Sequence, residues 1–205
     1  CSDETHIERV VFHPDYTYSD FVGQILPRTD GTLISYPFVP GPFTRILKNS
    51  YDNPSEQWFL VVEEINRGNA PAIFGDIFQL LDRNRDAKKG KIGESQYSIS
   101  NFDIAQWVYD DENRKVRLPS NLYILATMNT ADQNVFTLDT AFKRRWTMHS
   151  IENNISGCEH AKHQICGTSI TWEQFAIKIN DTIVDIGEGN LSSEDNRLGA
   201  YFVKA

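Results

Sequence analysis

Two adjacent carboxylates, Glu63 and Glu64, follow directly on the apolar run at residues 58–62. A short run of aromatic and β-branched residues is typical of a buried strand, and such strands belong to parallel sheets that are covered on both faces. Ligands of open parallel sheets bind beyond the carboxyl ends of the strands. The two acids therefore stand where one carboxylate can hold a metal ion and the other can orient a water molecule, as nucleotide hydrolysis requires. A strand that simply ends in solvated acids fits this stretch equally well.

A second apolar run, at residues 121–127, is followed closely by the amide side chain of Asn129. A short helical pattern at residues 138–146 then ends in cations, which include Arg144 and Arg145. Acids after one strand, an amide after another and arginines after a helix are the order of functional residues in AAA+ nucleotide hydrolases. This second stretch favours the catalytic interpretation of the first.

Two short motifs carry a narrower resemblance. Residues 63–69, Glu-Glu-Ile-Asn-Arg-Gly-Asn, and residues 128–132, Met-Asn-Thr-Ala-Asp, resemble the McrB-like family of AAA+ NTPases, the GTP-hydrolysing motor subunits of modification-dependent restriction systems. The resemblance runs from about residue 12 to residue 202. It implies an α/β fold of the P-loop NTPase type, in which helices cover both faces of a parallel sheet and a small helical lid follows.

The resemblance also implies cofactors and partners. GTP is the favoured nucleotide and ATP the alternative, each with Mg²⁺. The expected assembly is a homo-oligomeric ring, a hexamer, which joins a McrC-like nuclease subunit and reaches DNA through the assembly. Two alternative functions are a MoxR-like ATPase chaperone, which shares the chemistry but acts on protein, and a catalytically inactive module that only assembles with partners.

The resemblance assigns roles to individual residues. Glu64 is expected to be the general base that orients the attacking water, and Glu63 is expected to hold Mg²⁺ through water, in a place where the family usually has Asp. Asn129 resembles the sensor amide. Arg144 and Arg145 resemble arginine fingers, which act on the nucleotide of the neighbouring subunit. A basic helix end that complements the helix dipole is the structural alternative for the two arginines.

Two further positions are carried over from family motifs as nucleotide-site residues. Asp132 belongs to the Met-Asn-Thr-Ala-Asp signature, although Gln133 and Asn134 stand where the family usually has Arg and Ser. Arg197 lies in a stretch that resembles the lid motif near the second sensor position. The trans contacts of the loop after Asp132 are therefore left open.

The sequence contains no Gly-rich loop that ends in Gly-Lys-Ser or Gly-Lys-Thr, which such an enzyme needs to hold the phosphates. In the family this loop lies upstream of the strand at Ile7. The family's strand order, 5-1-4-3-2, places the loop's strand inside the sheet. We therefore expect the first strand and the phosphate loop to lie outside this chain, and the chain alone to be inactive.

The expected core domain is residues 1–152, with a parallel sheet from strands at 7–12, 58–63, 121–127 and 146–151. The expected lid is residues 153–205, with a helix that starts after a capping box of Thr171 and Gln174. A β insertion is expected at about 86–118. Its expected strands and turn lie at residues 97–99, 107–109 and 116–118, with the turn at 110–113.

Between the strands, residues 70–82 have helical spacing, with Asn69 as the N-cap. A helix is also expected from Phe43 to about residue 52. Residues 23–43 are rich in Gly and Pro and predict a loop or hairpin. The aromatic residues before them are expected to form a core-packing turn; they are Tyr16, Tyr18 and Phe21.

Two groups of residues have open interpretations. Residues 83–91 carry five cations, which form either a solvated turn or a pore-facing loop that meets DNA phosphates; they are Arg83, Arg85, Lys88, Lys89 and Lys91. A second group has residue types that bind zinc, but its spacing departs from the usual pairs, so that a polar lid loop is the favoured interpretation. This group is Cys158, His160, His163 and Cys166.

Composition sets broad bounds. The net charge of −8 gives no global sign of a nucleic-acid binder. No apolar run approaches the ~20 residues that cross a bilayer, and no N-terminal signal pattern is present. Three cysteines are few for a secreted chain, so we expect a cytoplasmic protein without a membrane partner.

Overall fold

The computed structural model describes residues 4–129, 135–186 and 197–203. Contacts between Cα atoms divide the chain into two compact units. The core unit comprises residues 1–129 and 134–147, and the C-terminal unit comprises residues 130–133 and 148–205.

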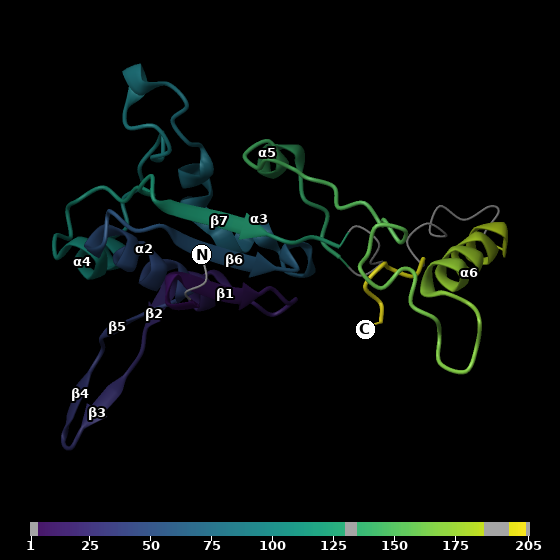
Figure 1. The fold of residues 1–205 in the computed structure, drawn as a ribbon. Helices are drawn as coiled ribbons and strands as arrows, with labels where there is room; N and C mark the ends of the chain where they lie inside the picture. Colours follow the sequence, from purple (N-terminus) through teal and green to yellow (C-terminus); the bar gives the residue numbers. More distant parts are fainter. Residues whose placement is uncertain (1–3, 130–134, 187–196, 204–205) are drawn as a thin grey trace. The chain divides into compact units, whose positions relative to one another are not determined.

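The core unit is built on a parallel sheet of β1 (Ile7–Val11), β6 (Trp58–Glu63) and β7 (Leu122–Ala126), in the order β1-β6-β7 (Figure 1). In β6, buried side chains alternate with half-buried ones, because neighbouring residues of a strand face opposite sides of the sheet. The prediction that β6 and β7 are neighbours in one sheet is confirmed, and so is the α/β fold class. The strand order is the one expected for strands 2, 3 and 4 of the 5-1-4-3-2 arrangement.

The fourth strand predicted at residues 146–151 is wrong for the described part of the chain, where residues 147–151 have no strand pairing. Trp146 packs against Phe142 instead, with ring centroids 5.8 Å apart, and Ile151 is 95% exposed. In the expected order this strand pairs only with the strand of the phosphate loop. Because the sequence has no such loop, the segment has no ladder partner.

Helices pack on the sheet and on one another. The helix α2 (Pro42–Asp52) contacts β1 and β6, and α1 (Tyr18–Val22) contacts α2 and α3 (Ala70–Phe74). The predicted continuous helix at 70–82 is wrong in its second half, which is the 3₁₀ helix η3 (Gly75–Leu81). Gly75 causes the break, because its φ of +50° lies in the left-handed region that favours glycine.

The three aromatic residues after β1 pack in the core, as predicted, although Tyr18 and Phe21 lie in α1 and not in a turn. Phe21 is fully buried, and Tyr16 stacks on Phe12 with ring centroids 5.2 Å apart. The Tyr18 hydroxyl donates a hydrogen bond to Asp76. The chain is thereby fixed at the point where it leaves β1.

The Gly- and Pro-rich stretch after α1 forms two antiparallel pairs, as the hairpin prediction allows. The inner pair is β2 (Gly23–Ile25) with β5 (Phe38–Pro40), and the outer pair is β3 (Arg28–Asp30) with β4 (Leu33–Ser35). Figure 1 shows the outer pair extending away from the sheet.

The insertion before β7 contains a helix that the sequence did not predict. Residues 107–109 belong to α4 (Phe102–Tyr109), so the predicted strand there is wrong. Asn101 caps this helix by accepting a hydrogen bond from the amide of Ile104, and the predicted turn follows at Asp110. Isolated antiparallel bridges join Ile99 to Val116 and Arg83 to Ser95. Besides η3, the described part of the core unit has three shorter 3₁₀ helices: η1 (Glu4–His6), η2 (Ile65–Arg67) and η4 (Ala87–Lys89).

The C-terminal unit contains α6 (Trp172–Ile186). The predicted capping box is confirmed, because the Gln174 amide donates to Thr171 Oγ1 and the Thr171 amide donates to Gln174 Oε1. Trp172 anchors a small buried cluster and donates its indole hydrogen to the carbonyl of Ala200. Residues 187–196 of the expected lid lie outside the described residues, and residues 197–203 form bends and a turn. Among the helices described in the two units, none is long and apolar enough to cross a membrane.

Candidate functional site

The carboxyl ends of β6 and β7 lie side by side, and Thr127 joins them beyond the last strand pair. Its amide donates to Val62, and its carbonyl accepts from Ile65. Its hydroxyl accepts a hydrogen bond from the backbone amide of Glu64, at 3.1 Å. Figure 1 shows both strands ending at the same edge of the sheet. The acids at the end of β6, Glu63 and Glu64, and the amide after β7 are therefore brought to one edge.

Glu64 sits at the turn where the chain leaves β6. Its backbone is left-handed, with φ 52° and ψ 48°, a conformation that a residue with a Cβ adopts only at a cost. Its side chain is about half exposed and lies 3.2 Å from the Arg67 guanidinium. The carboxylate is therefore held at the sheet edge, where it can accept a hydrogen bond from a water molecule.

Glu63, the expected Mg²⁺ ligand, forms an ion pair with Arg9 of the neighbouring strand β1. In the described part of the chain, no group of three or more His, Cys, Asp or Glu side chains could hold a metal ion. Mg²⁺ takes one or two protein carboxylates and completes its shell with water and phosphate oxygens, so the acidic edge fits this ion when a nucleotide is present.

Asn66 is a central residue of this edge, and the motif at residues 63–69 predicts no role for it. Its side-chain nitrogen donates to the backbone carbonyl of Asn129 at 2.7 Å, and its own carbonyl accepts from the amide of Phe136 at 2.7 Å. Asn66 thereby holds both ends of the signature loop, which we define as residues 129–136. Its buried Oδ1 has no hydrogen-bond partner among the described residues. The sequence does carry a signal for this role of Asn66. An amide side chain stands in Ile-Asn-Arg-Gly, directly after the two acids.

Asn129 itself lies beyond the end of β7 and is exposed. Its backbone carbonyl accepts a hydrogen bond from Asn66. This bond fixes the position from which the Asn129 side chain extends. Asp132 lies outside the described residues. Arg197 lies in the C-terminal unit and is exposed. The predicted roles of these three residues stay predictions.

The two adjacent arginines differ sharply. Arg145 is packed within its own chain: its Nε is 3.0 Å from Asp82, it donates to the carbonyl of Ala141, and its guanidinium lies 3.9 Å from the centre of the Phe78 ring. Arg144 is exposed. Of the two, Arg144 is therefore the one whose guanidinium faces solvent. Both follow the short helix α5 (Thr140–Lys143), which Asp139 caps.

The cation run at 83–91 is not a uniform solvated turn. Arg83 donates to the backbone carbonyls of Gly93, Pro119 and Leu122, and burial lowers its pKa to about 10. It therefore holds the insertion to the start of β7. The exposed cations of the run lie beyond it.

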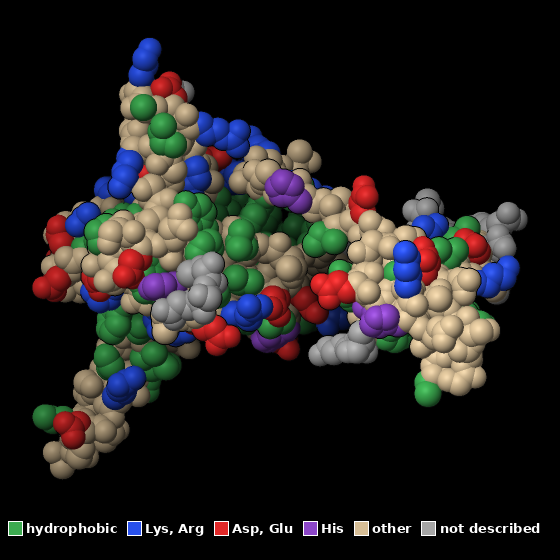
Figure 2. Space-filling model, in the orientation of Figure 1, with side chains coloured by type: hydrophobic (Ala, Val, Ile, Leu, Met, Phe, Trp, Pro, Cys, Tyr) green, Lys and Arg blue, Asp and Glu red, His purple; other side chains and the backbone are tan. Residues whose placement is uncertain are grey.

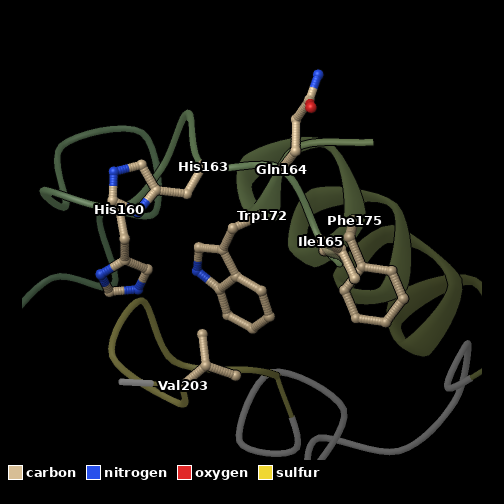
Figure 3. A pocket seen from close by; sticks show the side chains of 7 residues that line it. All are labelled: His160, His163, Gln164, Ile165, Trp172, Phe175 and Val203. Atoms are coloured by element: carbon tan, nitrogen blue, oxygen red, sulfur yellow. The ribbon is translucent and has the colours of Figure 1, made fainter. Parts of the chain in front are cut away.

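The four candidate zinc ligands do not gather into a ligand set. Cys158 is buried and Cys166 exposed, and the His160 ring nitrogen donates to the carbonyl of Ala200. Figure 3 shows His160 and His163 at one side of a pocket of about 470 Å³ that also has apolar lining residues. Those apolar residues are Ile165, Trp172, Phe175 and Val203.

Comparison with known proteins gives a family and two curated relatives. Residues 3–146 match the AAA domain of the dynein-related subfamily. The chain is 36% identical over 227 residues to the type II restriction enzyme BsuMI component YdiS of Bacillus subtilis (strain 168), a match that covers 96% of the chain and 63% of the relative. It is 26% identical over 146 residues to the type IV methyl-directed restriction enzyme EcoKMcrB subunit of Escherichia coli (strain K12), covering 71% of the chain and 28% of the relative.

The chain thus spans less than two thirds of the length of either curated relative. A solved crystal structure from Cytophaga hutchinsonii ATCC 33406 aligns with a TM-score of 0.40 and 16% identity, covering 92% of the chain and 40% of that structure.

Proposed function

Because the chain belongs to the AAA domain family, in its dynein-related subfamily, and is McrB-like, we propose that it is part of the nucleotide-hydrolysing motor of a modification-dependent DNA restriction system. GTP is the proposed nucleotide and ATP the alternative. The names of both curated relatives, each a component of a restriction enzyme, support this proposal. The proposed assembly is a ring of identical subunits, a hexamer, that works with a McrC-like nuclease subunit.

One observation carries the catalytic part of the proposal: the shared edge of β6 and β7. Glu64 accepts a hydrogen bond from the attacking water and orients it toward the terminal phosphate. The left-handed turn at Glu64 and its bond to Thr127 fix the carboxylate's starting point before nucleotide arrives. Asn129 contacts the terminal phosphate or the water from the neighbouring strand. Mg²⁺, when bound beside Glu63, would neutralise charge on the phosphates.

Arg144 supplies the third part. A guanidinium is permanently charged and binds phosphate oxygens in a planar, bidentate manner. Arg144 is exposed after α5, whereas Arg145 is engaged with Asp82 of its own chain. We therefore assign the finger to Arg144, acting on the nucleotide of a neighbouring subunit.

The test is Glu64→Gln in the complete protein, which includes the phosphate loop. The amide cannot act as a base, so turnover should fall ~10²–10⁴-fold while nucleotide binding is kept. Glu112→Gln, at an exposed turn, is the matched control and should hydrolyse like the parent. Turnover of GTP and ATP measured side by side decides the nucleotide.

A catalytically inactive assembly module is the second candidate, and a specific observation favours it: each acid of the edge is already paired, Glu63 with Arg9 and Glu64 with Arg67. If the complete protein binds nucleotide but turns over neither GTP nor ATP, alone or with its nuclease subunit, this candidate replaces the motor. A protein-remodelling role would instead appear as turnover stimulated by an unfolded protein and not by DNA.

A further inference from the structure

Residues 85–92, which we call the tip loop, are carried on a stem formed by residues 82–84 and 93–96. The two sides of the stem are joined by backbone hydrogen bonds. The amide of Asn84 donates to Glu94 at 2.8 Å, and the amide of Gln96 donates to Asp82 at 2.7 Å. Figure 1 shows the loop between η3 and α4 extending away from the sheet.

The stem is fixed from the inside. The Arg83 guanidinium donates hydrogen bonds to three backbone carbonyls. These belong to the stem and to the residues at and just before the start of β7. The buried hydroxyl of Ser95 donates to the carbonyl of Leu80 and accepts from the amide of Leu118. Because buried polar groups of this kind are costly to leave unpaired, the stem holds one geometry. The tip loop is therefore presented in a defined place.

The tip loop concentrates positive charge in an acidic protein. Residues 83–91 contain five Lys and Arg but one acid, Asp86, in a chain whose net charge is −8. Arg85, Lys88 and Lys91 are exposed and pair with no carboxylate among the described side chains. Asp86 is occupied in accepting from the backbone amide of Lys88. Figure 2 shows Lys and Arg side chains gathered on this projection.

We propose that the tip loop binds the phosphate backbone of nucleic acid, with duplex DNA as the ligand. Like charges held close together repel one another, and a polyanion removes that repulsion and releases its own counterions. Contacts with phosphates carry no sequence information, which suits a motor that must hold DNA irrespective of sequence. The choice of DNA rests on the proposed restriction function, whereas the phosphate contact rests on the tip loop alone.

Salt dependence is the first test. Each phosphate contact adds about 0.9 to the slope of log affinity against log salt on duplex DNA. In the complete protein, the triple variant Arg85→Gln, Lys88→Gln, Lys91→Gln should therefore bind fluorescent duplex DNA with a slope shallower by about 2–3. The control triple variant removes the same charges from exposed positions elsewhere: Arg28→Gln, Lys162→Gln, Lys178→Gln. It should bind like the parent.

Photocrosslinking is the second test, because it reports the site even if another part of the protein also binds DNA. A benzophenone amino acid replaces Ile92, which is 60% exposed on the tip loop, or Phe102, which is 60% exposed at the start of α4. Labelled DNA should crosslink from position 92 and not from position 102.

Equal slopes for the two triple variants, together with no crosslink from position 92, would overturn the proposal. A crosslink from position 92 to a protein subunit in place of DNA would assign the loop to a protein partner instead. All binding is measured without hydrolysable nucleotide, and basal turnover of the tip-loop variant should match the parent. Failure of the DNA contact is thereby distinguishable from failure of the proposed hydrolysis.

Discussion

The Nε atom of Arg145 lies 3.0 Å from a carboxylate oxygen of Asp82, 63 positions earlier in the chain. The Arg145 side chain is only 9% exposed, and its guanidinium covers the ring of Phe78. This contact ties the end of α5 to the end of η3. The neighbouring residue, Arg144, is thereby attached to a fixed point and remains exposed. Of two arginines that look equivalent in sequence, one stabilises the fold and the other is available to a partner.

The first prediction is that Arg145 contributes to stability and Arg144 does not. Arg145→Met should lower the free energy of unfolding by about 1.5–3 kcal/mol, since it leaves Asp82 without its charged hydrogen-bond partner. Arg144→Met should change it by less than about 0.5 kcal/mol. Urea denaturation of both variants measures the difference. In a double-mutant cycle, Asp82→Asn and Arg145→Met should be non-additive, and additivity would show that the pair is not coupled.

The second prediction concerns Asn66. Asn66→Ala removes the side-chain hydrogen bond to the backbone carbonyl of Asn129. This change should destabilise the region by about 1–3 kcal/mol of free energy. The loss of stability should be local, because the backbone carbonyl of residue 66 still accepts a hydrogen bond from the amide of Phe136. Hydrogen exchange should therefore accelerate around residue 129 while the amides of β7 stay protected. Asn49→Ala, on α2, is the control for a general effect of removing an amide. Unchanged exchange around residue 129 would argue against the role of Asn66.

The third prediction is a loss of stability at alkaline pH. Burial, first of all, raises the pKa of Tyr16 to about 12 and also raises the pKa values of Tyr18, Tyr51 and Tyr109. A tyrosine in the unfolded chain titrates near 10, so only the unfolded state loses protons between that pH and the folded pKa. The stability is thus fully present below about pH 10 and is lost as pH rises toward about 12 and beyond.

Urea midpoints at pH 8, 10 and 11, with tyrosine absorbance followed in parallel, test this prediction. Midpoints should fall between pH 10 and 11, and the absorbance change should accompany unfolding. The double variant Tyr51→Phe, Tyr109→Phe should flatten the decline. The same decline in that variant would show that these two hydroxyls are not responsible.

Much of the sheet could be predicted because its signals are local. The apolar run of β6 and the acids that follow it specify a buried strand and the point where it ends without reference to the rest of the chain. The capping box at Thr171 likewise needs only four consecutive residues. Neighbouring strands could be paired because strand order follows from the family resemblance.

The failures have non-local causes. Residues 107–109 have strand-like composition, yet Asn101 caps a helix there, and a cap outweighs weak propensity in a short segment. The strand expected at 146–151 lacks a ladder partner, which no local pattern reports. The different surroundings of Arg144 and Arg145 depend on Asp82 and Phe78, which are distant in sequence and contact Arg145. Tertiary contacts of this kind cannot be predicted from the spacing of residue types along the sequence.

The last prediction is that Glu64 and Arg144 act from different subunits. Glu64 lies at a strand end, and in the proposed motor it acts on the nucleotide of its own subunit, whereas Arg144 is exposed after α5. In the complete protein, the Glu64→Gln and Arg144→Ala variants should each hydrolyse nucleotide slowly. If Arg144 is a finger, Arg144→Ala should lower the turnover rate ~10³–10⁵-fold. Mixing the two variants should restore part of the activity, because some interfaces then pair an intact base with an intact finger.

The control for this mixing is the double variant Glu64→Gln, Arg144→Ala combined with Glu64→Gln, which leaves no intact base in any ring and should stay inactive. Native mass spectrometry must show that mixed rings form in both experiments. If mixed rings form and the first combination restores nothing, Arg144 does not act in trans. Its charge would then serve the helix end of α5, where a cation interacts favourably with the dipole, and the motor would need its finger from another residue.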